Sequence, residues 1–213
     1  MRINMPSKYI AGGLSIIAAI ASIGATIHFS SPSDATNIEP ASNIYSVSEA
    51  TKVLDANLSE AQSQKEDELK EVQESYTLPP GGTFEIEYTF PEINDQLDQV
   101  QAQTTQRSSE ESEFQVHEVW YEPGYFKSDA LVQWQCAWMK EAVLAQESQN
   151  TARFADAIAQ LRGFKNRPEI SMFPDYDIFL SENITPLEKG DSRAARAFLN
   201  SGYSCVEENQ IKE

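Results

Sequence analysis

Residues 128–147, which read SDALVQWQCAWMKEAVLAQE, decide the fold that the sequence predicts. Their apolar side chains recur at i, i+4, i+7 and i+11, the spacing of one helix face. The members of that face are Val132, Cys136, Met139 and Val143, and it is widened by Leu131, Trp134, Trp138, Ala142 and Ala145. Ser128 has the residue type of an N-cap, and Asp129 suits the positive end of a helix. We therefore expect a central helix over this stretch.

Shorter helices are expected on the C-terminal side of the central helix. Their predicted starts are a cap at Asn150 or Thr151, the capping box Thr185-Pro186-Leu187-Glu188, and a cap at Asp191. Gly163 and Gly202 are expected to end the first and the last of them, because glycine is favoured just past a helix. Together with the central helix they make a helical core at 128–205.

Residues 46–78 predict another long helix. Ser46 and Glu49 have the spacing of a capping box, and no Gly or Pro interrupts the segment before Pro79. Its apolar stripe is thin, and Lys65 and Glu68 lie on the seam that a coiled coil would use. We interpret the segment as a polar helical stalk, with weak self-association through the stalk as the alternative.

Two segments have the pattern of β-strands. Residues 83–90 alternate strictly between apolar and polar side chains, and residues 114–121 do so less clearly. The two could pair as an antiparallel ribbon across a mobile loop at 101–113, which is polar and without periodicity. The predicted fold class is therefore mainly α, with a minor α+β part.

An apolar run near the N-terminus, Tyr9–Phe29, sets the predicted compartment. At about 1.5 Å per residue a helix over this run is long enough to cross a hydrocarbon core. Arg2 and Lys8 precede the run, and basic residues stay on the cytoplasmic side of a membrane. We therefore expect a single-pass membrane anchor, with residues 30–213 outside the cytoplasm.

The predicted organisation has four parts: an anchor or signal peptide at 1–29, a flexible linker at 30–45, the stalk at 46–78 and an extracytoplasmic domain at 79–213. A cleaved signal peptide is the alternative to the anchor, because Ala19-Ile20-Ala21 fits the small-residue cleavage pattern. Small residues at helical spacing would also let two membrane helices associate. They are Ala11, Ser15, Ala18, Ser22 and Ala25.

The chain contains two cysteines, Cys136 and Cys205. Disulfides persist outside the cytoplasm, and two cysteines allow one pairing within a chain. We therefore predict a bridge between them, with two free buried thiols as the alternative.

The formal net charge is −17. Because residues 1–29 hold two bases and no acid, the exported part carries −19. Such a surface repels phosphate backbones, which excludes nucleic acids as an expected partner. It would attract a basic partner or cations, although solubility alone also explains an acidic surface.

No catalytic, cofactor or metal site is predicted. The sequence lacks the nucleophile motifs Gly-x-Ser-x-Gly and Ser-x-x-Lys, and past the apolar run His117 is the one histidine. With Glu118 and Glu122 it matches no zinc spacing. Asp175 and Asp177 alternate as calcium ligands do, but the glycine and the terminal glutamate of a calcium loop are absent.

Aromatic residues offer a further candidate, because they could stack on sugar rings beside a pair of catalytic carboxylates. They are Trp120, Tyr121, Tyr125, Phe126, Trp134 and Trp138. Aromatic residues at helical spacing are more often part of a core.

We therefore expect a membrane-anchored, extracytoplasmic accessory protein that binds or scaffolds an unidentified protein partner in the cell envelope, without catalytic activity. The first alternative is a cleaved, secreted domain that binds a ligand in an aromatic pocket. The second is an enzyme that uses acidic residues.

Overall fold

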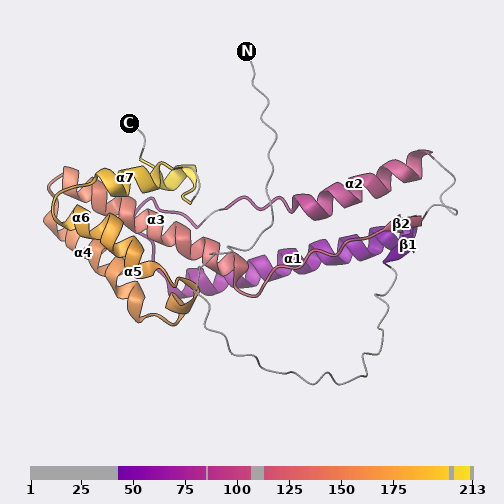
Figure 1. The fold of residues 1–213 in the computed structure, drawn as a ribbon, viewed down its shortest axis with the longest axis horizontal. Coiled ribbons are helices and arrows are strands. Elements are labelled where there is room, and N and C mark those ends of the chain that lie inside the picture. The colour runs from indigo at the N-terminus through magenta and orange to yellow at the C-terminus, as the bar shows by residue number, and fades with distance from the viewer. Residues whose placement is uncertain (1–42, 85, 107–112, 202–203, 212–213) are drawn as a thin grey trace, which may run out of the picture. The chain divides into compact units, whose positions relative to one another are not determined.

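The computed structural model describes residues 43–84, 86–106, 113–201 and 204–211 (Figure 1). These residues are mainly helical with a small antiparallel sheet, which confirms the predicted fold class at this level. The elements are β1 (Ile44–Ser46), α1 (Val47–Ser75), α2 (Pro91–Gln106), β2 (Glu113–Gln115), α3 (Tyr125–Glu147), α4 (Thr151–Gly163), α5 (Tyr176–Phe179), α6 (Thr185–Glu188) and α7 (Arg193–Leu199). Short 3-10 turns cover Phe164–Asn166, Pro168–Met172 and Glu207–Asn209, and a π turn covers Leu180–Ile184.

Helix α3 is the predicted central helix, and it is buried on almost every side. Between Ala130 and Val143 all side chains are buried except those of Val132 and Lys140, which are half-buried. Helices α1, α4 and α7 pack against it (Figure 1). A helix that is covered all round lies at the centre of a fold.

The start of α3 differs from the prediction. Its N-cap is Gly124, with a φ of +89°, and Ser128 lies inside the helix, where its hydroxyl donates to the carbonyl of Tyr125. The first amides are capped from another element. The two carboxylate oxygens of Glu68, on α1, accept from the amides of Gly124 and Lys127 at 2.8 and 2.9 Å. A buried carboxylate at the positive end of a helix satisfies amides that would otherwise lack partners.

The cluster Trp134-Gln135-Cys136-Ala137-Trp138 connects α3 to both of its flanking segments. The indole nitrogens of Trp134 and Trp138 both donate to the carbonyl of Thr77, at 2.9 and 3.0 Å. Residues four apart share a face of a helix, whereas a residue two positions away points elsewhere. The tryptophans therefore hold the chain just after α1, while Cys136, which points in another direction, contacts a different segment.

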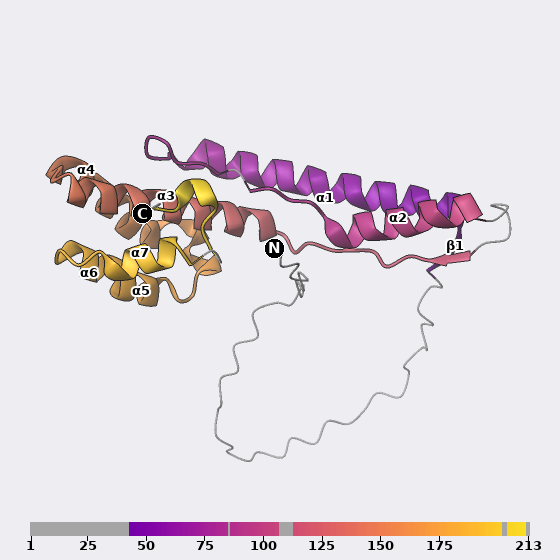
Figure 2. The ribbon, with the colours of Figure 1, turned by 90° about the horizontal axis from the view of Figure 1, so that it is seen from above.

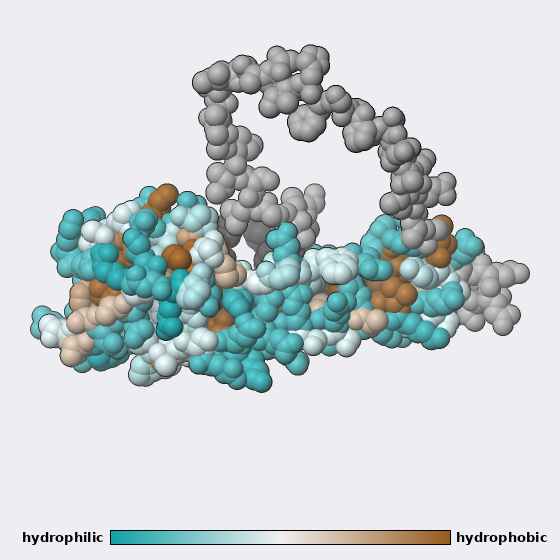
Figure 3. Space-filling view, turned by 90° about the horizontal axis from the view of Figure 1, so that it is seen from below, coloured by the Kyte–Doolittle hydropathy of each residue, from teal (hydrophilic) through white to brown (hydrophobic). Residues whose placement is uncertain are grey.

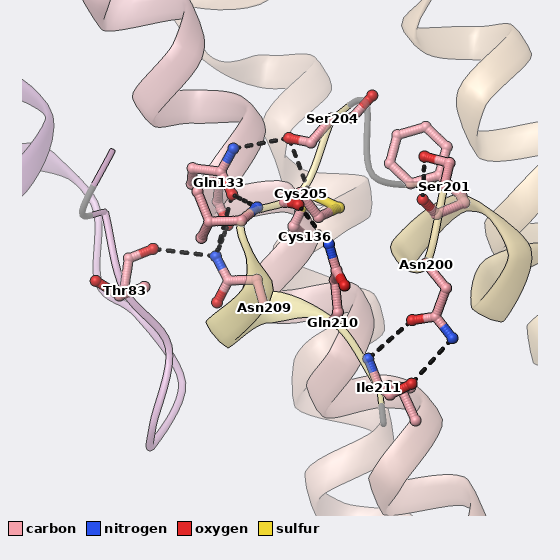
Figure 4. The surroundings of a disulfide bond; sticks show 12 residues. Thr83, Gln133, Cys136, Asn200, Ser201, Ser204, Cys205, Asn209, Gln210 and Ile211 are labelled. Carbon is pink, nitrogen blue, oxygen red and sulfur yellow. Dashed lines mark hydrogen bonds between the residues drawn. A yellow bond between two sulfur atoms is a disulfide. The ribbon is translucent and has the colours of Figure 1, made fainter. Parts of the chain in front are cut away.

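That segment is the C-terminal part of the chain. The predicted Cys136–Cys205 disulfide is present, with its Cα atoms 5.8 Å apart (Figure 4). Gln133 reinforces it, because its side chain donates to the carbonyl of Ser204 and accepts from the amide of Val206. Buried Asn209 adds a bond to the carbonyl of Thr83 at 3.1 Å (Figure 4). A disulfide persists in an oxidising environment, which indicates an extracytoplasmic or secreted domain.

Helix α1 forms where it was predicted, with the capping box of Ser46 and Glu49. Its interpretation as a solvated stalk is corrected by its packing, because Val47, Leu54 and Ala61 are buried. Helix α2 lies along α1 and covers that apolar side (Figure 2). Helix α2 and the short β1–β2 sheet together cover the narrow apolar stripe of α1.

The polar side of α1 also makes specific contacts. The side-chain amide of Asn57 both donates to and accepts from the main chain of Val119, each at 3.0 Å. The amide of Gln64 donates to the carbonyl of Glu122 at 3.1 Å. These side chains supply hydrogen bonds to an extended segment that has no neighbouring strand there. On α2, Gln96 does the same for His117.

The sheet pairs other residues than those expected. Strand β1 pairs antiparallel with β2, with Ile44 opposite Gln115. The structure thus places a strand at the end of the predicted linker, 30–45, whose residues 30–42 lie outside the described part. Residues 101–106, predicted as part of a mobile loop, continue helix α2. The remainder of that loop, 107–112, lies outside the described residues.

Residues 83–90 were the clearest predicted strand, and in the described part they belong to no sheet. Their alternation is nevertheless real, because Phe84 and Phe90 are buried while Glu87 is exposed. The segment packs on α3, where the ring of Tyr88 lies 4.9 Å from that of Phe126. The apolar face therefore contacts a helix, whose own main chain is already hydrogen-bonded.

The C-terminal helices follow the prediction in part. Asn150 caps α4, which ends at Gly163, and Arg153 joins it to buried Glu141 of α3 through bonds of 2.6 and 2.7 Å. Thr185 forms no capping box, because a π turn runs directly into α6. Helix α7 begins one residue later than expected, after Ser192, and ends at Leu199.

The predicted anchor at 1–29 lies outside the described residues. Within the described ranges, none of the helices has the length and apolar character needed to span a bilayer.

The first prediction concerns the bridge. Cys136→Ser or Cys205→Ser should lower the free energy of unfolding by about 2–5 kcal/mol, the usual loss for a native disulfide in a small domain. Urea unfolding followed by circular dichroism measures this. Reductant should destabilise the native chain and leave either variant unchanged; a native chain that is indifferent to reductant would contradict the prediction.

The second prediction concerns the cap of α3. Glu68→Ala should cost about 1–3 kcal/mol, because two amides at the helix start lose their acceptor in a buried place. Glu66→Ala is the matched control, since Glu66 is exposed on the same helix. Equal midpoints for the two variants in thermal unfolding would show that the cap is not needed.

Candidate functional site

The structure separates the predicted aromatic residues into two groups. Trp134 and Trp138 are interior and hold Thr77, as described above, so they form no part of a binding surface. Other rings gather at the N-terminal end of α3. We name this group the aromatic cluster, and its members are Tyr88, Phe90, Tyr121, Tyr125 and Phe126.

The rings of the aromatic cluster pack around Phe126, which is fully buried: Tyr88, Phe90 and Tyr125 meet it edge to face, and Tyr121 is tilted against it. The centroids of Tyr88 and Tyr121 lie 4.9 and 5.0 Å from that of Phe126, and Tyr125 lies 5.1 Å away. Phe90 contacts Tyr121 at 5.8 Å. Such spacings are favourable for aromatic pairs. The buried rings thereby fix the positions of Tyr121 and Tyr125 at the surface.

Two carboxylates lie beside these rings. Asp129 accepts from the hydroxyl of Tyr88 at 3.1 Å. Burial raises the pKa of the Asp129 carboxyl above its ordinary value, and the bond from Tyr88 offsets part of that rise. Burial, together with the charge of exposed Glu92, raises the pKa of Tyr121. The phenols therefore stay neutral at physiological pH and offer uncharged π faces next to negative charge.

The outer side of this region is open to solvent. Tyr125 exposes 46% of its surface, and Trp120, the neighbour of Tyr121 in the chain, exposes 78%. Most of the face seen in Figure 3 is hydrophilic, with smaller apolar patches. Trp and Tyr are enriched at interfaces, because one side chain supplies both apolar area and a polar tip.

Aromatic faces next to carboxylates suit a cation. An ammonium or guanidinium group over a tyrosine or tryptophan face is attracted by the ring quadrupole, and Glu92 and Asp129 add their charges. Tyr88, Phe90, Glu92 and Asp129 were not predicted as site residues. The sequence did indicate that Tyr88 and Phe90 are packed side chains, since both lie on the apolar face of the alternating segment 83–90.

The metal-ligand candidates are not assembled into a site. Among the described residues, no three His, Cys, Asp or Glu side chains come together as a metal site requires. His117 is exposed and is held by its main chain to Gln96. Asp177 pairs with Lys165 at 2.5 Å.

Surface hollows occur elsewhere. One of about 540 Å³ is lined by Lys140, Leu144 and C-terminal residues, and Lys140 donates to the carbonyl of Glu208 at 2.5 Å. Another of about 280 Å³ adjoins the end of α1, where Lys127 pairs with Glu71. The lysines of both hollows thus already have protein partners, so the aromatic cluster is the better candidate site.

Comparisons with known proteins add no relative. No protein-family model, no curated protein and no solved structure matches this chain.

The third prediction concerns Asp129. Because its folded pKa is raised above the ordinary 3.8, its contribution to stability is largest when it is protonated. That contribution falls as the pH rises from about 3.8 through the folded pKa, and then stays constant.

Asp129→Asn should therefore gain stability relative to the native chain across that window. Urea unfolding at a series of pH values measures the difference. Asp98→Asn, which removes an exposed carboxylate on α2, is the matched control for the loss of a charge. A gain for Asp129→Asn that is no larger than that for the control would contradict the prediction.

Proposed function

We propose that this chain is a binding module that works outside the cytoplasm, held at the membrane by residues 9–29 and without catalytic activity of its own. The disulfide supports the extracytoplasmic part of this proposal, since bridges are rare in reducing compartments. The apolar run supports the anchor, because its length and flanking charges fit a membrane span. Removal of the run as a signal peptide would give the same module in secreted form.

The observation that carries the binding role is the exposure of Tyr125 in a rigid aromatic cluster, with Trp120 exposed one residue before Tyr121 in the chain. Tyrosine and tryptophan rings at a surface supply apolar area together with a polar tip, and interfaces are enriched in them. Phe126 contacts both Tyr121 and Tyr125, and Phe90 contacts Tyr121, so these rings are held in place and little conformational entropy is lost when a partner binds. Rigid aromatic anchors are the side chains that dominate interface energetics.

The chemistry of the surface favours a basic protein partner. The formal charge of −17 attracts cationic chains over distances of about a Debye length. Glu92 and Asp129 place some of that charge at the rings. Lysine or arginine side chains could then stack on Tyr125 or Trp120 and pair with these acids.

The fourth prediction tests this role with a labelled peptide of alternating arginine and valine, Arg-Val-Arg-Val-Arg-Val. Trp120→Ala and Tyr125→Ala should each weaken its binding to the full chain by about 5- to 30-fold, the effect of losing one desolvated cation–π contact. Fluorescence anisotropy measures the dissociation constants.

Ile178→Ala is the matched control, because Ile178 is 52% exposed on α5, away from the cluster. It should leave the affinity unchanged. Equal affinities for all four proteins would refute the proposed role of this surface.

A further inference from the structure

The main chain of residues 86–88 lacks hydrogen-bond partners within the described part of the protein. Apart from the side-chain bond of Tyr88 to Asp129, none of these three residues takes part in a hydrogen bond there. The other extended segment is treated differently, since Gln96 and Asn57 bind the main chain of His117 and Val119. Side chains thus satisfy the main chain of His117 and Val119, whereas the main chain of 86–88 has no such partner among the described residues.

The open segment is nevertheless held in an extended course. Gly82 lies against Ala137, and Phe84 enters the core around Trp134. Tyr88 and Phe90 lie in the aromatic cluster at the other end of the segment. The ends are thus anchored along α3, a helix that has no free main-chain groups to offer.

The sequence of this segment is that of a strand. Its strict alternation, with apolar Phe84, Ile86, Tyr88 and Phe90 on one face, is the strongest strand signal in the chain. Main-chain amides and carbonyls in an extended, preordered course accept an added strand without further loss of backbone entropy. The strand pattern and the main chain of 86–88, which has no partner among the described residues, are both what an added strand would use.

We infer that residues 86–88 pair with an extended, basic segment of the partner protein, which adds a strand at this position. The inference rests on the proposed binding role and gives it a mechanism. The added strand places its basic side chains on the face of exposed Glu87, and the side chains between them on the opposite face, where Tyr88 and Phe90 join the aromatic cluster. Main-chain bonds supply affinity, the acidic face selects cationic side chains, and the aromatic face accepts apolar ones.

A second copy of this chain fits the segment less well. The sequence has glutamate at 85 and 87, so antiparallel pairing of two copies centred on Ile86 would set like charges opposite one another. Like charges directly across a strand pair are destabilising. Arginine or lysine at alternate positions of a partner strand would instead form opposite-charge pairs.

The test compares two labelled peptides on the full chain: Arg-Val-Arg-Val-Arg-Val and a version with an N-methyl group on every peptide bond. The second keeps all charges and side chains but has no main-chain donors. The unmethylated peptide should bind about tenfold more tightly, since each net main-chain hydrogen bond contributes about 0.5–1.5 kcal/mol. Only alternate amides of a strand face one edge, so exchange with deuterium should slow either at Ile86 and Tyr88 or at Glu87 when the unmethylated peptide binds. It should not slow with the methylated peptide.

A pair of variants separates charge at the segment from charge elsewhere. Glu87→Gln should weaken binding of the unmethylated peptide about two- to fivefold, in the range of one exposed ion pair. Glu182→Gln removes an exposed acid on the π turn and should have no effect.

The outcomes distinguish this inference from the function on which it rests. If both peptides bind equally and Tyr125→Ala weakens both, the binding role stands and strand addition is overturned. If neither binds, or Trp120→Ala and Tyr125→Ala change nothing, the proposed binding role fails as well. If exchange at 86–88 slows with protein concentration alone, the added strand comes from a second copy and the inference of a basic partner is overturned.

Discussion

A helix that is buried on almost every side needs partners on most of its surface, and this requirement on α3 organises the described domain. Residues 134–138 of α3 satisfy this requirement, because their side chains point in different directions and contact different segments. Trp134 and Trp138 share one carbonyl, that of Thr77, and so fix the turn that follows α1. Cys136 and Gln133 hold the C-terminal segment instead. Segments that are distant in the chain thus meet on a single helix.

The second constraint is the satisfaction of main-chain groups in a domain with little sheet. Extended segments normally satisfy their amides against a neighbouring strand. Here α1 and α2 provide side-chain amides and a carboxylate in place of that strand. Asn57, Gln64 and Glu68 lie at i, i+7 and i+11, so they form one polar stripe along α1. What looked like a solvated surface is a set of donors and acceptors for another segment.

Much of the fold could be predicted because its signals are local. The caps at Ser46 and Asn150, the central helix and the single cysteine pairing each depend on residues close in the chain or on elimination. The predictions were wrong where tertiary contacts determine the cap of a helix or the partner of a strand. Glu68 replaces a local cap for α3, which is why Ser128 was misassigned. The partner of β2 could not be identified either, because the alternation in 83–90 is equally suited to packing on a helix.

The aromatic cluster was predictable in part. Tyr121, Tyr125 and Phe126 were among the predicted residues because they are close in sequence, and the structure brings them together. Tyr88 joins them from a segment more than 30 residues earlier, which periodicity alone cannot reveal. Trp134 and Trp138 belong to the core, as helical spacing favoured, and their indole nitrogens bond to the carbonyl of Thr77.

The buried apolar side chains form two clusters, and both cysteines belong to the one that surrounds α3, α4 and α7. The other cluster joins the first half of α1 to α2 and the sheet, and Leu69 packs against both. The disulfide therefore restrains one cluster, while the second depends on packing and hydrogen bonds, without a covalent link, within the described part. Such an arrangement favours subglobal unfolding, in which the second cluster melts before the first and cooperativity is incomplete. Because Phe90 and Phe126 belong to the second cluster, a ligand at the aromatic surface would stabilise that weaker half by mass action and merge the two transitions into one.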